Sequence, residues 1–480
     1  MERIQNYLGG EFKDSMTGDF MEVYEPAVGL VYGSMPRSTQ DDVHFAVDQA
    51  VKASDSWAAL APDARSKWLI RIAEAIEHNA DQLAKAESKD TGKPITLAKQ
   101  LDIPRAAANF RFFATSILHS HTPAHHTNAG IFNYTNRHPV GVAGCISPWN
   151  LPLYLLTWKI APALATGNCV VAKPSEITPM TAYLLSGICE RINFPKGVIN
   201  IIHGPGPTTG EAIVTHPDVS AISFTGGTQT GRRIASLAAP SFKKVSLEMG
   251  GKNPNIIFDD CNLEAAIDIT IKSSFTNQGQ ICLCGSRVFV QKGIYKKFRT
   301  ALVESARNLQ PSDPSDPNTK MGALSSKPHL KKVLGYIELA KSEGGKILTG
   351  GNRVHLKERC KDGYFMQPTI VEGLDNRCRT NQEEIFGPVI SLIPFSEEEE
   401  VVAMANDSGY GLSATIWTEN LSRAHRVSKS LKCGVVWVNC WLVRDLRTPF
   451  GGMKQSGVGR EGGEEALRFF TEAQNVCLKI

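Results

Sequence analysis

The alternation of short apolar runs with helical stretches between Pro139 and Leu247 constrains the fold of this chain most strongly. Apolar runs predict strands, and helical spacing predicts helices between them. The strands are expected at 141–146, 169–172, 198–202, 221–224 and 245–247, and the helices at 151–165, 180–192 and from about 229. Alternation over such short spans is typical of a parallel sheet with helices on both faces. The sequence therefore predicts an α/β fold that binds ligands at the carboxyl ends of its strands.

The rest of the chain predicts further helices and a second lobe. Helical spacing indicates two helices between Val43 and Ala86, and another over 96–118 that Pro104 interrupts. A less regular alternation over 252–450 predicts a second α/β lobe, and the last residues, 476–480, predict a strand. Four histidines stand in the stretch 119–130. Because no acidic or cysteine partner is nearby, a polar loop is favoured over a metal site there.

Composition excludes several classes of protein. A chain of 480 residues with a net charge of +4 and interleaved charges has no dense Lys/Arg run, so we expect no nucleic-acid partner. No apolar stretch is long enough for a bilayer span, and the first residues contain no signal-peptide core, so we expect no membrane partner. The 11 scattered cysteines favour reduced thiols in the cytoplasm over a disulfide framework.

Polar and glycine-rich motifs follow the predicted strands at 147–150, 173–176, 204–206 and 226–227. Glycine lets the backbone approach a pyrophosphate, and a helix N-terminus favours the anion. A complete Gly-x-Gly-x-x-Gly pattern is absent, so the glycines alone fit a dinucleotide site and plain turns equally well. The carboxylate of Glu176 suits ribose hydroxyls and would repel a 2′-phosphate, which favours NAD over NADP. The alternative is an ordinary charge at a helix N-terminus.

A carboxylate and a thiol, Glu248 and Cys282, lie in one stretch of the chain. Glu248 belongs to Leu-Glu-Met-Gly-Gly-Lys, and Cys282 ends Asn-Gln-Gly-Gln-Ile-Cys. An ionised thiol is a strong nucleophile, and a carboxylate can take a proton from water. The pair therefore predicts acyl chemistry through a thioester that is hydrolysed. The alternative for Glu248 is a solvent-facing residue at a strand end.

The motifs at 147–150 and 173–176, those that contain Glu248 and Cys282, and those at 224–228, 384–389 and 449–454 resemble motifs of the NAD(P)-dependent aldehyde dehydrogenase superfamily. They occur in the family's order and cover nearly the whole chain. The resemblance implies a Rossmann-like parallel-sheet cofactor domain, an α/β catalytic domain and a small β oligomerisation element, which would make a homodimer or tetramer. The boundaries it implies are 1–121 with 139–250 for NAD binding, 251–448 for catalysis, and 122–138 with 462–480 for oligomerisation.

The resemblance also implies roles for individual residues. Cys282 matches the nucleophile, Glu248 the general base for deacylation, and Asn150 the donor to the oxyanion. Because Glu248 is present, release of the acyl group to water is favoured over transfer to coenzyme A. Cys284 is expected to be a bystander. The expected NAD contacts are Ile146, Ser147, Pro148, Trp149, Lys173, Ser175, Glu176, Gly206, Phe224, Thr225, Gly226, Gly227, Gly231, Leu247, Gly250, Glu384 and Phe386.

Two stretches, 102–113 and 439–450, look like those of superfamily members that oxidise 2-aminomuconate and 2-hydroxymuconate 6-semialdehydes in tryptophan and aromatic degradation. Each carries an arginine, and a guanidinium binds a carboxylate through two hydrogen bonds. Ordinary ion pairs are the alternative, for example between Arg105 and Asp102. Arg447 fits a carboxylate contact and a surface pair equally well. The expected substrate contacts are Arg105, Arg444, Trp158, Leu155 and Phe450.

The predicted function is NAD-dependent oxidation of such a semialdehyde to the dicarboxylate, through a thiohemiacetal and a thioester on Cys282. One alternative is a dehydrogenase for an aliphatic or betaine-type aldehyde. Another is a non-catalytic binding protein that reuses the fold. No metal is expected to take part.

Overall fold

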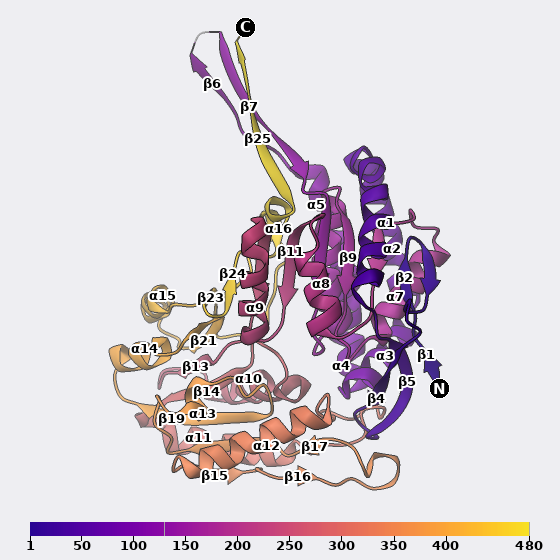
Figure 1. Ribbon diagram of the computed structural model, residues 1–480. Coiled ribbons are helices and arrows are strands. Elements are labelled where there is room, and N and C mark those ends of the chain that lie inside the picture. The colour runs from indigo at the N-terminus through magenta and orange to yellow at the C-terminus, as the bar shows by residue number, and fades with distance from the viewer. Residues whose placement is uncertain (129, 480) are drawn as a thin grey trace.

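The computed structural model describes residues 1–128 and 130–479, which form two α/β lobes and a narrow sheet that projects from one of them (Figure 1). The first lobe contains an eight-stranded sheet and the second a seven-stranded sheet. Each lobe has its own apolar core, as expected for a chain of this length. The predicted α/β class is confirmed.

The first sheet has the order β24-β12-β11-β8-β9-β10-β2-β3, and its five strands from β12 to β10 run parallel. These five are the predicted strands, with bounds that differ by a few residues. The sheet consists of β2 (Asn6–Leu8), β3 (Glu11–Lys13), β8 (Val142–Ile146), β9 (Cys169–Lys173), β10 (Ile199–Ile201), β11 (Val219–Thr225), β12 (Lys244–Glu248) and β24 (Gly457–Val458).

Helices cover this sheet, and the N-terminal ones differ from the prediction in number. Three helices, not two, occupy the region from Val43 to Ala86, because Pro62 starts a new helix and Asn79 separates the next. Pro104 lies in the first turn of α5, after a π-helical segment, Ala98–Asp102, so the predicted interruption is confirmed. The main helices are α1 (Gln40–Ala58), α2 (Pro62–His78), α3 (Ala80–Thr91), α5 (Ile103–Ser116), α6 (Pro152–Ala165), α7 (Met180–Arg191) and α9 (Thr228–Ala238).

The second lobe has a sheet of order β15-β18-β19-β14-β13-β21-β22, in which only β15 runs antiparallel to its neighbour. Its three predicted helices are present as α10 (Leu263–Phe275), α11 (Lys292–Asn308) and α12 (Lys327–Ser342). The other elements are β13 (Asn253–Ile257), β14 (Gly285–Gln291), β15 (Lys346–Thr349), β18 (Thr369–Glu372), β19 (Val389–Phe395), α14 (Glu398–Asn406), β21 (Ser413–Trp417), α15 (Leu421–Ser430) and β22 (Val435–Val438).

After the second lobe the chain returns to the first. β24 pairs with β12 so that Gly457 lies opposite Glu248, at the carboxyl end of the first sheet. This return brings residues after 448 next to a strand that is some 200 residues earlier in the sequence. After β24 come α16 (Gly463–Phe469) and the last strand, β25 (Thr471–Lys479).

The projecting sheet consists of β6 (Ala124–Asn128), β7 (Ile131–Pro139) and β25, in the order β25-β7-β6 (Figure 1). The prediction of a polar loop over 119–130 is wrong for 124–128, because this segment forms a ladder with β7 and places His126 opposite Phe132. The predicted C-terminal strand is present, starts earlier at Thr471 and pairs with β7 of the same chain. Residues 129 and 480, which fall within the predicted oligomerisation element, lie outside the described residues.

The described residues contain neither a cluster of metal-binding side chains nor a helix that could cross a membrane. Within 1–128 and 130–479, no group of three or more His, Cys, Asp or Glu side chains is arranged to hold a metal ion. No helix among these residues has the length and apolar character that a membrane crossing needs.

Candidate active site

The thiol of Cys282 lies in a loop between α10 and β14 whose backbone is tightly constrained. Asn277 and Gln278 have left-handed φ angles of 52° and 56°, which is uncommon for residues other than glycine. Gly279 follows with φ 71°, and a Cβ atom there would stand 2.3 Å from the Gly387 carbonyl oxygen, so only glycine fits. Asn253 Nδ2 donates to the Cys282 carbonyl at 2.7 Å and so fixes the loop beyond the turn.

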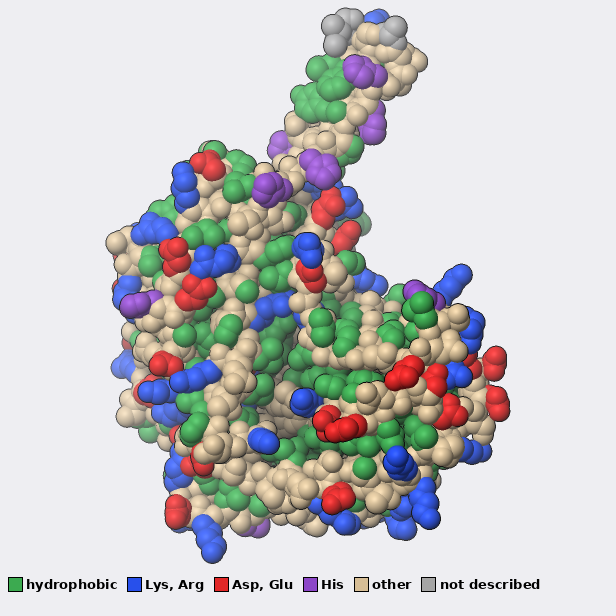
Figure 2. Space-filling view, turned by 180° about the vertical axis from the view of Figure 1, so that it is seen from behind, with side chains coloured by type: hydrophobic (Ala, Val, Ile, Leu, Met, Phe, Trp, Pro, Cys, Tyr) green, Lys and Arg blue, Asp and Glu red, His purple; other side chains and the backbone are tan. Residues whose placement is uncertain are grey.

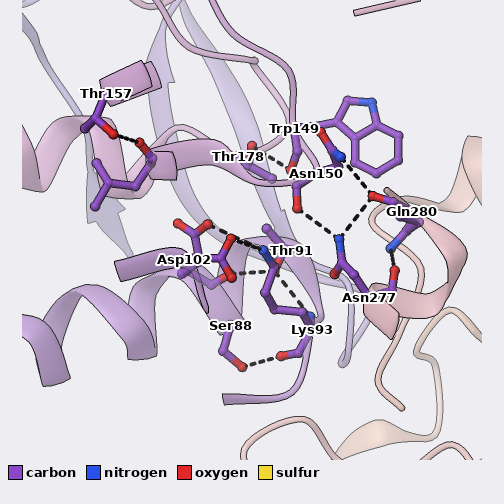
Figure 3. Close-up of polar contacts among 12 residues, drawn as sticks. Ser88, Thr91, Lys93, Asp102, Trp149, Asn150, Thr157, Thr178, Asn277 and Gln280 are labelled. Atoms are coloured by element: carbon purple, nitrogen blue, oxygen red, sulfur yellow. Dashed lines mark hydrogen bonds and ion pairs between the residues drawn. The ribbon is translucent and has the colours of Figure 1, made fainter. Parts of the chain in front are cut away.

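Asn150 joins the carboxyl end of the first sheet to this loop. Its Nδ2 donates to the Gln280 carbonyl at 2.8 Å, and Asn277 Nδ2 donates to the Asn150 carbonyl at 3.1 Å (Figure 3). Asn150 is buried. An amide nitrogen carries two hydrogens, so the second N–H of Asn150 remains available to a ligand beside the thiol.

Two cavities meet at Cys282, which lines both of them. Figure 2 shows that the surface between the two lobes is hollowed, with many hydrophobic side chains along the hollow. The larger cavity has a volume of about 230 Å³. Eight of the expected cofactor residues line it: Pro148, Trp149, Thr225, Gly226, Gly227, Gly250, Glu384 and Phe386. Asn150, Leu155 and Met249 line it too, as do His329 and Lys332, which the sequence motifs did not indicate.

Glu384 and Phe386 are held firmly in the larger cavity. The Gly251 N–H donates to Glu384 Oε1 at 3.0 Å, and a Cβ atom on Gly250 would collide with that carboxylate at 2.0 Å. Phe386 has a left-handed φ of 61°, and its carbonyl oxygen lies 2.7 Å from His329 Nε2. Burial lowers the pKa of His329 to about 4, so the ring is neutral and its Nε2–H can donate to that carbonyl.

Lys173 and Glu176 lie together at the end of β9. Lys173 Nζ is 3.1 Å from Glu176 Oε2, and the Gly206 N–H is 3.5 Å from Glu176 Oε1. Burial alone would raise the pKa of Glu176, but Lys173 and the backbone N–H groups together hold it below its usual value. Glu176 is therefore ionised at neutral pH. Ser175 is buried beside this pair.

The other expected cofactor residues fall into two groups. Gly206, like Gly227 in the larger cavity, has open space where a Cβ would stand, so a ligand can approach its backbone closely. The Ser147 hydroxyl has no hydrogen-bond partner among the described residues. The second group faces protein: a Cβ on Gly231 would touch the Met249 sulfur at 2.8 Å, and three side chains belong to the core of the first lobe, namely Ile146, Phe224 and Leu247.

Glu248 lines the smaller cavity, which has a volume of about 30 Å³. Neither Glu248 oxygen has a hydrogen-bond partner among the described residues, and the side chain is buried. Burial first, and then the negative charge of Glu461, hold the pKa of Glu248 well above its usual range. Glu461 is itself paired with buried Lys159 at 2.7 Å, and Lys159 Nζ also donates to Ser223 Oγ at 3.2 Å. Sequence motifs indicated neither Glu461 nor Lys159.

Burial also raises the pKa of the Cys282 thiol, and the charges of Glu384 and Glu248 raise it further, while Arg444 opposes them. The resting side chain is therefore a thiol at neutral pH, and it must lose its proton before or during attack. Cys284, two residues on, is buried and does not line either of the two cavities that meet at Cys282.

Four of the five expected substrate contacts line the smaller cavity: Leu155, Trp158, Arg444 and Phe450. The Arg444 guanidinium lies 3.8 Å from the centre of the Phe450 ring. The nearest acid in the sequence, Asp445, pairs instead with exposed Arg447 at 2.6 Å. Arg447 therefore follows the surface-pair alternative.

Arg105, the fifth expected substrate contact, does not line this cavity. Its guanidinium is 5.2 Å from the ring centres of Tyr154 and Trp158, which both line the cavity. The suggested pair with Asp102 is wrong, because Asp102 pairs with buried Lys93 at 2.8 Å (Figure 3).

Comparisons with known proteins agree with this geometry. The family model described as "Aldehyde dehydrogenase family" matches residues 12–476. A 2-aminomuconic semialdehyde dehydrogenase of Danio rerio is 52% identical, covering 99% of this chain and 98% of the relative. A 2-hydroxymuconic semialdehyde dehydrogenase of Pseudomonas sp. (strain CF600) is 45% identical and covers 100% of both. An aldehyde dehydrogenase of Bacillus cereus, solved as an NAD+ complex, has a TM-score of 0.97 at 39% identity, covering 100% of this chain and 97% of that one.

Proposed function

This chain belongs to the aldehyde dehydrogenase family, and from that premise we propose that it oxidises a carboxylate-bearing semialdehyde, 2-aminomuconate or 2-hydroxymuconate 6-semialdehyde, to the dicarboxylate with NAD. One observation carries the choice of substrate class. Arg444 lines the same cavity as the Cys282 thiol, so a carboxylate at one end of a short molecule can meet a guanidinium while its aldehyde meets the thiol.

The larger cavity and the residues that follow β9 and β10 suit NAD. Glu384, Phe386 and Gly227 line the cavity together with Cys282, and the open backbone at Gly227 leaves room for a pyrophosphate. Outside the cavity lining, ionised Glu176 suits the hydroxyls of a ribose, and the Gly206 N–H lies 3.5 Å from its Oε1. When bound, the oxidised nicotinamide accepts a hydride from the substrate carbon. The charge of Glu176 would repel a 2′-phosphate, which supports NAD over NADP.

The chain's own residues supply the acyl chemistry. Cys282 Sγ attacks the aldehyde carbon, and the oxygen that gains negative charge accepts hydrogen bonds from Asn150 Nδ2 and the Cys282 backbone N–H. Once the carbon has been oxidised, the acyl group is a thioester on Cys282. Glu248, in its ionised form, takes a proton from water, which attacks the thioester and releases the carboxylate and the thiol.

Two further features belong to this proposal. In the projecting sheet, β6 and β25 are largely exposed and β7 is mostly half-buried, which supports a homodimer or tetramer built through this sheet. All 11 cysteines are free thiols among the described residues, which suits the reducing cytoplasm.

Arg444→Ala should raise KM for a muconate-type semialdehyde about 10- to 100-fold with little change in kcat, because a charge-assisted hydrogen bond contributes about 1.5–3 kcal/mol. Steady-state NADH absorbance measures both constants. Arg447→Ala is the matched control, since Arg447 is exposed and paired with Asp445, and should behave as wild type. A wild-type enzyme that turns over propanal as efficiently as the semialdehyde would contradict the substrate class while leaving the dehydrogenase activity intact.

Asn150→Ala should lower kcat about 100-fold, because the loss of one oxyanion donor typically costs about 3 kcal/mol of activation free energy. The variant should remain folded, since it loses only the hydrogen bond to the Gln280 carbonyl. Thermal melting and NAD titration serve as controls. A kcat within threefold of wild type would remove Asn150 from the oxyanion role.

A further inference from the structure

Asn109 holds Arg105 in a single orientation. The two residues are one helical turn apart on α5, and Arg105 Nε donates to Asn109 Oδ1 at 3.0 Å. Asn109 is completely buried between α5 and α6. The Arg105 guanidinium also lies against the Tyr154 and Trp158 rings of α6, so it is held by one hydrogen bond and two aromatic faces.

The amide of Asn109 has only one possible orientation. Its Nδ2 lies 3.0 Å from the Tyr154 carbonyl and 3.0 Å from Thr157 Oγ1. The Thr157 hydroxyl, which Figure 3 shows bonded to a backbone oxygen, gives its own hydrogen to a carbonyl one turn back, at Leu153 or Tyr154. It therefore accepts from Asn109. Both Nδ2 hydrogens are thereby used. The oxygen of the amide must face Arg105.

This arrangement engages the inner nitrogen of Arg105 and leaves the outer ones for another partner. Arg105 Nη2 is buried and has no hydrogen-bond partner among the described residues. Arg444 lines the smaller cavity, and Arg105 packs on the Tyr154 and Trp158 rings that line the same cavity, so both guanidinium groups stand at its wall. Burial lowers the pKa of Arg105, Tyr154 and Asp445 oppose this, and the positive charge of Arg444 lowers it further. Two neighbouring cations, one with an unpaired buried N–H, are stabilised by an anion placed between them.

We propose that Asn109 is a positioning residue for substrate specificity: it directs the free N–H groups of Arg105 toward the same substrate carboxylate that Arg444 binds. The inference rests on the proposed function, because it needs a substrate with a carboxylate distal to the aldehyde. Asn109 itself does not contact the substrate. Its effect is transmitted through Arg105, and it links α5 to the α6 residues that line the substrate cavity.

Asn109→Leu tests the proposal, because leucine has a similar volume and can orient nothing by hydrogen bonding. We expect KM for a muconate-type semialdehyde to rise about tenfold, with kcat, KM for NAD and kcat/KM for propanal within twofold of wild type. Asn109→Asp is the second variant. Its carboxylate would neutralise Arg105 internally, so it should lose the preference for the charged aldehyde while keeping activity on propanal.

A double-mutant cycle separates positioning from a general structural role. In an Arg105→Ala background, Asn109→Leu should cause no further rise in KM, since the residue it positions is gone. Equal losses on propanal and on the semialdehyde, or additive losses in the double variant, would overturn the proposal. A wild type without preference for the charged aldehyde would instead refute the proposed substrate class.

Discussion

Cys282→Ala should abolish NADH formation, with a loss of more than about 10⁴-fold in kcat, because no other group in the cavity can form the thioester. Cys282 is the one thiol that lines both the 230 Å³ cavity and the 30 Å³ cavity among the described residues. The measurement is steady-state absorbance with the semialdehyde, together with NAD titration to show that the cofactor site is intact.

Cys284→Ala is the matched control for this prediction. Cys284 is also a buried thiol, its carbonyl is held by the same Asn253 side chain at 2.9 Å, and it is two residues away. Its loss should lower activity less than about threefold. Residual activity of Cys282→Ala above about 1% of wild type, or an inactive Cys284→Ala, would show that the nucleophile has been misassigned.

The pKa of Cys282 adds a pH signature to the same experiment. Since burial and the acidic neighbours raise the pKa of the thiol, the thiolate fraction is small at neutral pH and grows as pH rises. Alkylation of the ligand-free protein by iodoacetamide at Cys282 should therefore be slow at pH 7 and faster at pH 9. Cys282→Ala should lack this pH-dependent alkylation at position 282.

Local patterns in the sequence were sufficient for the sheet and for the residues at its edge. β8 is apolar throughout and β9 is apolar up to its last residue, Lys173, so the first polar residues mark where each strand ends. Trp149 and Asn150, which follow β8, line the larger cavity. Cys282 and Glu248 could be identified for the same reason, because each stands in a distinctive motif at the end of a buried element.

Contacts between residues far apart in the sequence could not be predicted in this way. Lys159 and Glu461 are 302 positions apart, and nothing near either residue indicates the other. His329 and Lys332 lie on an ordinary helix, α12, that only the fold brings to the larger cavity. The histidines at 124–128 suggested a loop, but this segment is the strand β6 because it pairs with β7. The residues of β6 alone do not encode that pairing.

Sequence patterns also could not decide which of two arginines three residues apart, Arg444 or Arg447, faces the cavity. Both carry a guanidinium in one loop, but Leu442 in that loop has a left-handed φ of 58°, and the Trp437 indole donates to the Val443 carbonyl at 2.9 Å. These constraints direct the Arg444 side chain onto Phe450 in the cavity and leave Arg447 outside. Composition and spacing contain no information about such a turn.

Glu248→Gln should stop the enzyme after its first half-reaction. Glutamine keeps the shape of the side chain but cannot take a proton from water, so oxidation should proceed once while hydrolysis of the thioester slows by about 10²- to 10⁴-fold. A rapid-mixing experiment should show a burst of about one NADH per active site, followed by a very slow steady rate. Mass spectrometry of the quenched protein should find the acyl group on Cys282. A variant without a burst would place Glu248 before oxidation instead of after it.

The pH dependence of the wild type tests the same role with a definite sign. Glu248 acts as a base only when ionised, and its pKa is raised by burial and by the charge of Glu461, so the hydrolysis rate should increase as pH rises through that raised pKa. Glu461→Gln removes the neighbouring negative charge, and the positive charge of Lys159 stays nearby. Both effects favour the ionised form of Glu248. The rising limb of the hydrolysis rate should therefore move to lower pH in Glu461→Gln and disappear in Glu248→Gln. A limb that stays in place in Glu461→Gln would mean that a different group titrates, and the assignment of Glu248 as the base would then fail.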